Sequence, residues 1–136
     1  PQTWGRIKPL VGARTIVTGH SLGAARADVL TALMTLDGVP PLARVVFGEP
    51  KPGLPHFADL IASIPARPYV NCGSSGHDLV TDVPFTFPPE DYVRPTPLMA
   101  VSEAPAPIDD WGPFAWHHAE LYAGGVAKLN PMPAVG

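Results

Sequence analysis

The apolar positions in the first half of the chain change between two periods. Residues 14–18 (RTIVT) are rich in β-branched side chains and stop at Gly19, which is typical of a short buried strand. In residues 22–36, apolar side chains recur every three or four positions, which predicts an amphipathic helix. The Asp37-Gly38 pair is expected to end this helix, and Pro40-Pro41 prevents the helix from continuing beyond it. The apolar face expected from the spacing comprises Leu22, Ala25, Val29, Leu33 and Leu36.

The same alternation of strand and helix continues up to residue 72. Residues 43–48 (ARVVFG) predict a second strand, and residues 68–72 (PYVNC) predict a third. Between them, residues 55–63 predict a short helix that carries Phe57 and Ile61 on one face with Leu60. Strand, helix, strand, helix and strand at this spacing indicate right-handed crossovers and a parallel sheet. The chain is therefore predicted to have an α/β fold.

Prolines break the pattern in the second half of the chain. From Asp82 to Pro113 the prolines exclude long strands and helices, so we interpret residues 84–113 as an ordered, proline-rich loop over the sheet. Residues 116–129 predict a terminal helix, although two adjacent glycines weaken it. A length of 136 residues is typical of one domain, so we assign 1–136 to a single domain.

Composition excludes several classes of protein. A net charge of −3 gives no basic surface, so we expect no nucleic-acid partner. No apolar run reaches the roughly 20 residues of a transmembrane helix, and no secretory signal opens the chain. A single cysteine, Cys72, cannot form an internal disulfide. Because secreted proteins can also lack disulfides, both a cytoplasmic and a secreted location remain open. We expect neither a cofactor nor a metal site.

Residues 19–23 (GHSLG) place one serine between two glycines where a strand turns into a helix. This is the G-x-S-x-G nucleophile elbow in its expected strand–turn–helix context. Side chains at Gly19 and Gly23 are expected to collide with the neighbouring strand and helix, and Ser21 is expected to adopt a strained conformation. The backbone N–H of Leu22 at the helix start could bind an oxyanion. The alternative is a serine that only caps the helix, but the context favours a nucleophile.

A catalytic serine needs a base and an acid, which follow in the order serine, acid, histidine in α/β-hydrolases. Asp78 and Asp82 both follow the third predicted strand, at the edge of the sheet where ligands bind. Their residue type and position leave the choice between these two carboxylates open. Each could equally be a turn aspartate.

Two of the five histidines are candidates for the base. His117 and His118 both follow the proline-rich loop at the start of the terminal helix. His20 lies within the elbow, where its side chain is expected to point elsewhere. His56 and His77 are interpreted as surface or core residues, which is the commoner role of a lone histidine.

Several ordered motifs resemble the class 3 lipase family of fungal-type triacylglycerol lipases. They are residues 18–25 (TGHSLGAA), 47–53 (FGEPKPG) followed by Phe57-Ala58, 78–84 (DLVTDVP) and 117–122 (HHAELY). The resemblance covers residues 14 to about 126 and implies an α/β-hydrolase fold. It also implies that Ser21 is the nucleophile, Asp78 the acid and His117 the base, with His118 as the alternative base.

The chain departs from this family before the elbow. The resemblance implies additional N-terminal strands and a loop with a second oxyanion donor, for which residues 1–13 are too short. The predicted elbow strand then has one neighbour, and an open strand edge favours pairing with another chain. We therefore expect a second copy, a separate subunit or a missing segment to complete the sheet.

The sequence leads to a hypothesis of carboxylic ester hydrolysis, as in lipases and esterases, through an acyl-enzyme on Ser21. Its substrate would be an ester or lipid such as an acylglycerol. The alternative is a catalytically incomplete lipase-like fragment with a structural or interaction role. A serine peptidase ranks last, because no peptide-binding groove is indicated.

Overall fold

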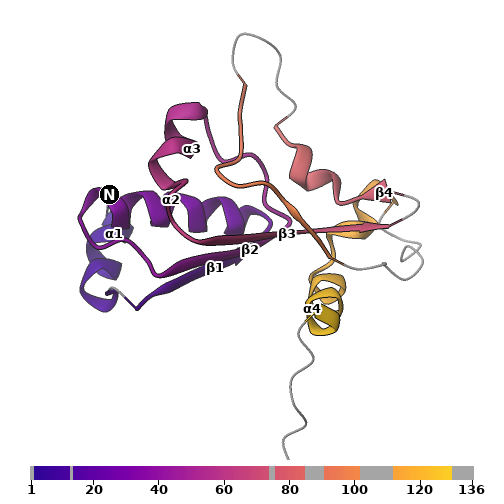
Figure 1. The fold of residues 1–136 in the computed structure, drawn as a ribbon, viewed down its shortest axis with the longest axis horizontal. Helices are drawn as coiled ribbons and strands as arrows, with labels where there is room; N and C mark the ends of the chain where they lie inside the picture. Colours follow the sequence, from indigo (N-terminus) through magenta and orange to yellow (C-terminus); the bar gives the residue numbers. More distant parts are fainter. Residues whose placement is uncertain (1, 13, 74–75, 85–90, 102–111, 130–136) are drawn as a thin grey trace, which may run out of the picture.

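A computed structural model describes residues 2–12, 14–73, 76–84, 91–101 and 112–129 (Figure 1). Its α-helices are α1 (Gln2–Ile7), α2 (Leu22–Leu36), α3 (Pro55–Ile61) and α4 (Ala119–Leu129). Its strands are β1 (Ile16–His20), β2 (Ala43–Phe47), β3 (Ala66–Gly73), β4 (Gly76–His77) and β5 (Met99–Val101). Short 3-10 helices are η1 (Lys8–Leu10), η2 (Leu79–Asp82) and η3 (Gly112–His117).

A mostly parallel sheet organises these elements. β2 pairs in parallel with β1 on one side and with β3 on the other. The other edge of β3 pairs in parallel with β5, and the carboxyl end of β3 pairs antiparallel with β4. Figure 1 shows α2 and α3 on one face of the sheet and α4 on the other. Right-handed crossovers between successive neighbouring strands place both connecting helices on one face. The predicted α/β-hydrolase-like class is confirmed.

Each face of the sheet has its own apolar core. On the α2 face, Val17 and Val46 from the strands pack with Met34 and two alanines of the helix. On the opposite face, Tyr69 and Val101 pack with Tyr122 of α4. Alternate side chains of a strand point to opposite faces, so the β2 residues beside Val46 face α4 instead.

The predicted boundaries of α2 agree with the structure, but the predicted buried face is wrong. Leu22, Val29 and Leu36 are 61%, 48% and 68% exposed. The buried face instead comprises Ala24, Ala27, Asp28, Thr31, Ala32 and Met34. Small side chains let the helix approach the sheet closely, and the buried polar side chains find partners in the sheet or within the helix itself. Thr31 Oγ1, for example, donates a hydrogen bond of 2.8 Å to the Ala27 carbonyl.

Three charged side chains form a fully buried cluster between α2 and β2. Arg44 is within hydrogen-bond distance of both Asp28 and Glu49, and all three side chains are 0% exposed. Burial, followed by the nearby Asp28 carboxylate, raises the pKa of Glu49 to about 8 despite the Arg44 charge. Burial also raises the pKa of Asp28. One guanidinium thus holds two carboxyl groups that favour sharing a proton.

This cluster predicts that stability falls as the pH rises from about 5 to 8. The folded protein keeps a proton on Glu49 that the unfolded chain has lost, so rising pH favours unfolding by up to about 1.4 kcal/mol per pH unit. Glu49→Gln, which cannot titrate, is expected to flatten this slope in urea unfolding experiments. Glu120→Gln, at an exposed position, serves as the control. Equal slopes for wild type and Glu49→Gln would contradict the prediction.

Other sequence predictions differ from the structure at element ends and in the second half. β1 begins at Ile16 rather than residue 14, and the terminal helix 116–129 is divided into η3 and α4. A strand, β5, lies within the predicted 84–113 loop, because β3 offers it a free edge. Residues 85–90 and 102–111 of that loop lie outside the described residues. Before β1 the chain forms α1 and η1, with no strand among the described residues there.

β1 lies at the edge of the sheet. Among the described strands it pairs with β2 alone, and its Ile16 side chain is 56% exposed. The expected partner that would complete the sheet is not tested by these observations. In the described part of the chain, no helix combines the length and the hydropathy needed to cross a membrane.

Candidate functional site

The site begins at the turn between β1 and α2. Ser21 has φ 59° and ψ −129°, and it is the one non-glycine residue with positive φ among the described residues. Its backbone N–H donates a 3.0 Å hydrogen bond to the Phe47 carbonyl, which extends the pairing of β1 with β2 through the turn. Its side chain makes no capping hydrogen bond to α2. A strained serine without a capping role differs from an ordinary N-cap.

The two glycines of the elbow have different roles. A Cβ at Gly19 would lie 2.1 Å from the Gly23 carbonyl oxygen and 2.7 Å from the Ala24 nitrogen. A Cβ at Gly23 would meet nothing within 4 Å. The expected steric restriction is therefore found at Gly19, and the expectation for Gly23 is wrong. Position 19 must be glycine because the backbone of Gly23 lies against it, whereas position 23 has room for a side chain.

Asp78 is the carboxylate at the centre of the site. Asp78 is 0% exposed, and its Oδ1 accepts a hydrogen bond from the Val80 N–H at 2.9 Å. Its Oδ2 is within hydrogen-bond distance of two side chains. His117 Nδ1 lies 2.7 Å from Oδ2, and the Tyr122 hydroxyl donates to the same oxygen at 2.5 Å. Burial alone would raise the pKa of Asp78, but the bonds from His117 and Tyr122 outweigh it and lower this pKa. Asp78 is therefore ionised at neutral pH.

An ionised carboxylate fixes the tautomer of His117. Since Asp78 can only accept, His117 Nδ1 carries the hydrogen, and in the neutral imidazole Nε2 therefore has the lone pair. Such an imidazole can take a proton at Nε2 while the carboxylate stabilises the resulting cation.

The structure places the alternative acid and base in other contacts. Asp82 Oδ2 lies 2.7 Å from His77 Nε2 in an exposed pair. His118 Nδ1 lies 3.6 Å from Glu120 Oε2. Of the two carboxylates and two histidines left open, Asp78 and His117 are the pair that the structure brings together.

Gly48, which follows β2, makes space for that pair. Its φ is +57°, and a Cβ there would lie 2.7 Å from Asp78 Oδ2 and 3.0 Å from His117 Nδ1. The sequence motif around Gly48 carries a resemblance to the class 3 lipase family but gives no physical reason for a glycine there. That reason is the close approach of acid and base at this position.

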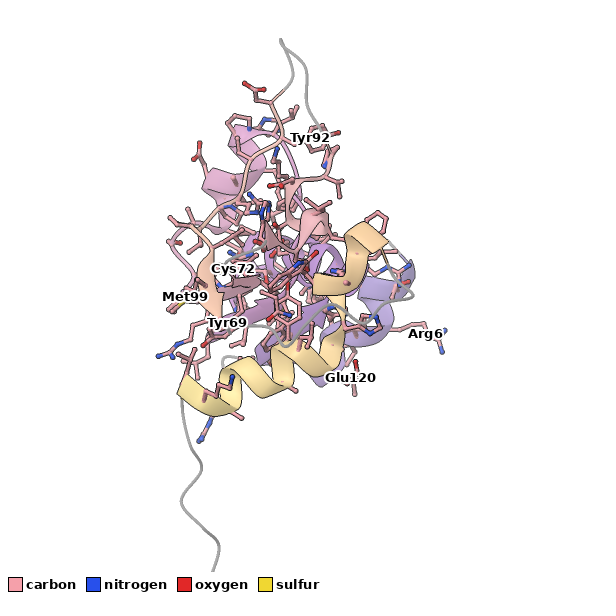
Figure 2. All side chains as sticks on the ribbon, turned by 90° about the vertical axis from the view of Figure 1, so that its right-hand side faces the viewer. Arg6, Tyr69, Cys72, Tyr92, Met99 and Glu120 are labelled. Atoms are coloured by element: carbon pink, nitrogen blue, oxygen red, sulfur yellow. The ribbon has the colours of Figure 1, made fainter. Side chains whose placement is uncertain are left out.

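Ser21 and His117 line the same open cleft. The cleft has a volume of about 560 Å³, and His20, His118, Ala119 and Glu120 complete its lining. Figure 2 shows Glu120 at the first turn of α4, beside η3. Leu22 begins α2 directly after Ser21, so its N–H belongs to the first turn and has no acceptor within the helix.

Two strand-end side chains hold the segment that carries His117. Asn71 Nδ2 on β3 donates a 3.1 Å hydrogen bond to the Trp116 carbonyl. His20 Nε2 on β1 lies 2.9 Å from the His117 carbonyl. The expectation that His20 points elsewhere is therefore wrong, because its ring faces the His117 segment.

Sequence reasoning missed the roles of Asn71, His20 and Tyr122 in this site. Tyr122 belongs to the motif at residues 117–122, which assigns it no role, and the sequence around Asn71 carries no signal of one. Among the described residues, no group of three or more His, Cys, Asp or Glu side chains could hold a metal ion.

The Tyr122 hydroxyl is expected to stabilise the ionised form of Asp78. Tyr122→Phe removes one of the two side-chain donors to a buried carboxylate, which predicts a loss of about 2 kcal/mol in the free energy of unfolding at pH 7. The pKa of Asp78 should rise, so the stability that its ionisation provides should be lost at a higher pH as the solution is acidified. Urea unfolding at several pH values measures both effects. Tyr92→Phe is the matched control, and equal losses in the two variants would contradict the prediction.

Comparisons with known proteins agree with this arrangement at the level of the family. A family model described as Lipase (class 3) matches residues 5–87, more than half of the chain. A protein named Phospholipase A1-II 1 from Oryza sativa subsp. indica is 29% identical over 116 residues, which cover 82% of this chain and 28% of the relative. Its namesake from Oryza sativa subsp. japonica gives the same values. The chain thus spans under a third of the length of these relatives. No solved structure matches it.

Proposed function

Because the chain belongs to the class 3 lipase family, we propose that it hydrolyses carboxylic esters of lipids through a Ser21-His117-Asp78 triad. The contact between Asp78 and His117, beside a cleft that also holds the strained Ser21, is the observation that carries this proposal. A nucleophile, a base with a free lone pair and an ionised acid are the groups that acyl transfer requires.

The proposed reaction proceeds in two halves. Ser21 Oγ attacks the acyl carbonyl while His117 Nε2 takes the hydroxyl proton, and Asp78 stabilises the imidazolium. The Leu22 N–H binds the oxyanion of the tetrahedral intermediate. His117 then gives its proton to the departing alcohol. A water molecule, activated by the same imidazole, releases the acid from the acyl-enzyme.

Hydrolysis by matched serine variants tests this function. Wild type should release nitrophenol from nitrophenyl butyrate, and Ser21→Ala should lower kcat by at least about 10⁴-fold. Ser63→Ala, an exposed position after α3, should behave as wild type. A folded wild-type chain that cleaves no ester would contradict the proposal and favour the structural or interaction role.

The substrate class can be narrowed with the same variants. The names of the two relatives contain phospholipase A1, which supports a glycerophospholipid as substrate. We expect hydrolysis of phosphatidylcholine vesicles to exceed hydrolysis of a triacylglycerol emulsion at equal ester concentration. The reverse order would favour an acylglycerol substrate.

The expected partner of β1 stays a prediction. The edge of β1 that no described strand covers and its exposed Ile16 side chain support pairing with another chain, and we propose a second copy as that chain. Sedimentation velocity should then show a dimer, whereas a stable, folded monomer would contradict this expectation.

A further inference from the structure

His20, the residue before Ser21, contacts the segment of the base in two ways. Its Nε2 lies 2.9 Å from the His117 backbone carbonyl oxygen. Its ring also stacks on the His117 imidazole, with ring centroids 4.6 Å apart and an interplanar angle of 27°. The Tyr122 ring lies edge-on to His20, with centroids 5.6 Å apart. His20 is neither nucleophile, acid nor base in the proposed triad, so these contacts need another explanation.

The acceptors fix the tautomers of both stacked rings. A carbonyl oxygen can only accept, so His20 Nε2 carries its hydrogen. A carboxylate can only accept as well, so His117 carries its hydrogen on Nδ1. In their neutral forms the two rings therefore hold opposite tautomers, and neither can change tautomer without losing its hydrogen bond.

We propose that His20 is a positioning residue for His117, which it holds by a hydrogen bond to the His117 carbonyl and by ring stacking. This inference rests on the proposed function for its effect on catalysis. Asn71 adds a second anchor, since its amide donates to the preceding carbonyl, that of Trp116. Two successive carbonyls are thus held by side chains from β1 and β3, while Asp78 holds the imidazole. Backbone and ring are both fixed, which keeps Nε2 directed at one position.

The charge state of His20 is compatible with this role. Burial, followed by the His117 charge, lowers the pKa of His20, although the hydrogen bond to the His117 backbone and the charges of Asp78 and Glu120 act in the opposite direction. Tyr122 also packs on this ring, and its own pKa is raised by burial and by Asp78. His20 is therefore neutral near pH 7 and does not oppose the proton that His117 gains during the reaction.

Two replacements separate the hydrogen bond from the ring. His20→Phe keeps an aromatic ring and removes the donor, whereas His20→Gln keeps an amide donor and removes the ring. We expect His20→Phe to lower kcat by about tenfold with little change in KM. His20→Gln should recover kcat to within about threefold of wild type, as expected when the donor is the main contribution. His56→Phe, at an exposed histidine of α3, is the control. Unchanged kcat in His20→Phe, or equal losses in the Phe and Gln variants, would overturn the proposal.

A second measurement does not depend on turnover. Nitrogen-15 NMR of the histidine rings, in wild type and in Ser21→Ala, should show His20 as the Nε2–H tautomer and His117 as the Nδ1–H tautomer. A His20 ring in the Nδ1–H form, or exchanging between tautomers, would overturn the positioning role. This readout decides the matter if His20→Phe does not fold. A chain with the expected tautomers but no esterase activity would instead contradict the proposed function and leave the His20 contact in place.

Discussion

Replacing His117 with alanine is expected to lower kcat for ester hydrolysis by at least about 10⁴-fold, whereas His118→Ala should cost less than about tenfold. The physical reason is the contact between His117 Nδ1 and Asp78 Oδ2, which leaves Nε2 of the same ring free to accept a proton. His118 Nδ1 instead lies 3.6 Å from Glu120 Oε2. Steady-state kinetics with nitrophenyl butyrate measures both variants, after circular dichroism has shown that each is folded.

The adjacent histidines make this comparison a strict one. Both residues line the cleft, and His118 directly follows His117, the last residue of η3, so a loss caused by general disturbance of this segment should affect both variants. A larger loss in His118→Ala than in His117→Ala would exchange the two assignments. Equal, small losses would remove both histidines from the reaction.

The second large effect is expected at the elbow. Gly19→Ala places a methyl group 2.1 Å from the Gly23 carbonyl oxygen, so the backbone of the turn must move. We expect a loss of about 3 kcal/mol or more in the free energy of unfolding, together with loss of esterase activity. Gly23→Ala adds the same methyl group where nothing lies within 4 Å, so it should be neutral or stabilise the helix by about 0.5–1 kcal/mol.

Urea unfolding and esterase activity of the two glycine variants provide the measurement. The pair is well matched, because both positions belong to the same five-residue motif and receive the same substitution. An equal loss of stability in Gly23→Ala and Gly19→Ala would contradict the difference in steric restriction between the two positions.

The parallel sheet and its crossover helices could be predicted from the sequence because their patterns are local. The β-branched run before Gly19 and the helical spacing after Ser21 both arise from residues that are close together in the sequence. The orientation of α2 could not be predicted this way. Its buried face contains Asp28, whose partner Arg44 lies in the next strand, and hydropathy alone assigns a charged side chain to the surface.

The site shows the same limit. The resemblance to class 3 lipase motifs selected Ser21, Asp78 and His117 as candidates, since each motif is contiguous in the sequence. The contact from Tyr122 to Asp78 and that from Asn71 to the Trp116 carbonyl join segments 44 and 45 positions apart. Hydrophobic periodicity does not predict such contacts. The direction of the His20 side chain was predicted wrongly because its partner is the backbone carbonyl of His117, 97 positions away.

The central claim is that Ser21 is a nucleophile activated by His117 and Asp78. The most direct measurement is covalent labelling with a fluorophosphonate, followed by intact-mass and peptide mass spectrometry. We predict one label per chain, located on Ser21, with labelling absent in Ser21→Ala and strongly slowed in His117→Ala. A folded chain that remains unlabelled, or one labelled at another residue, would contradict the claim.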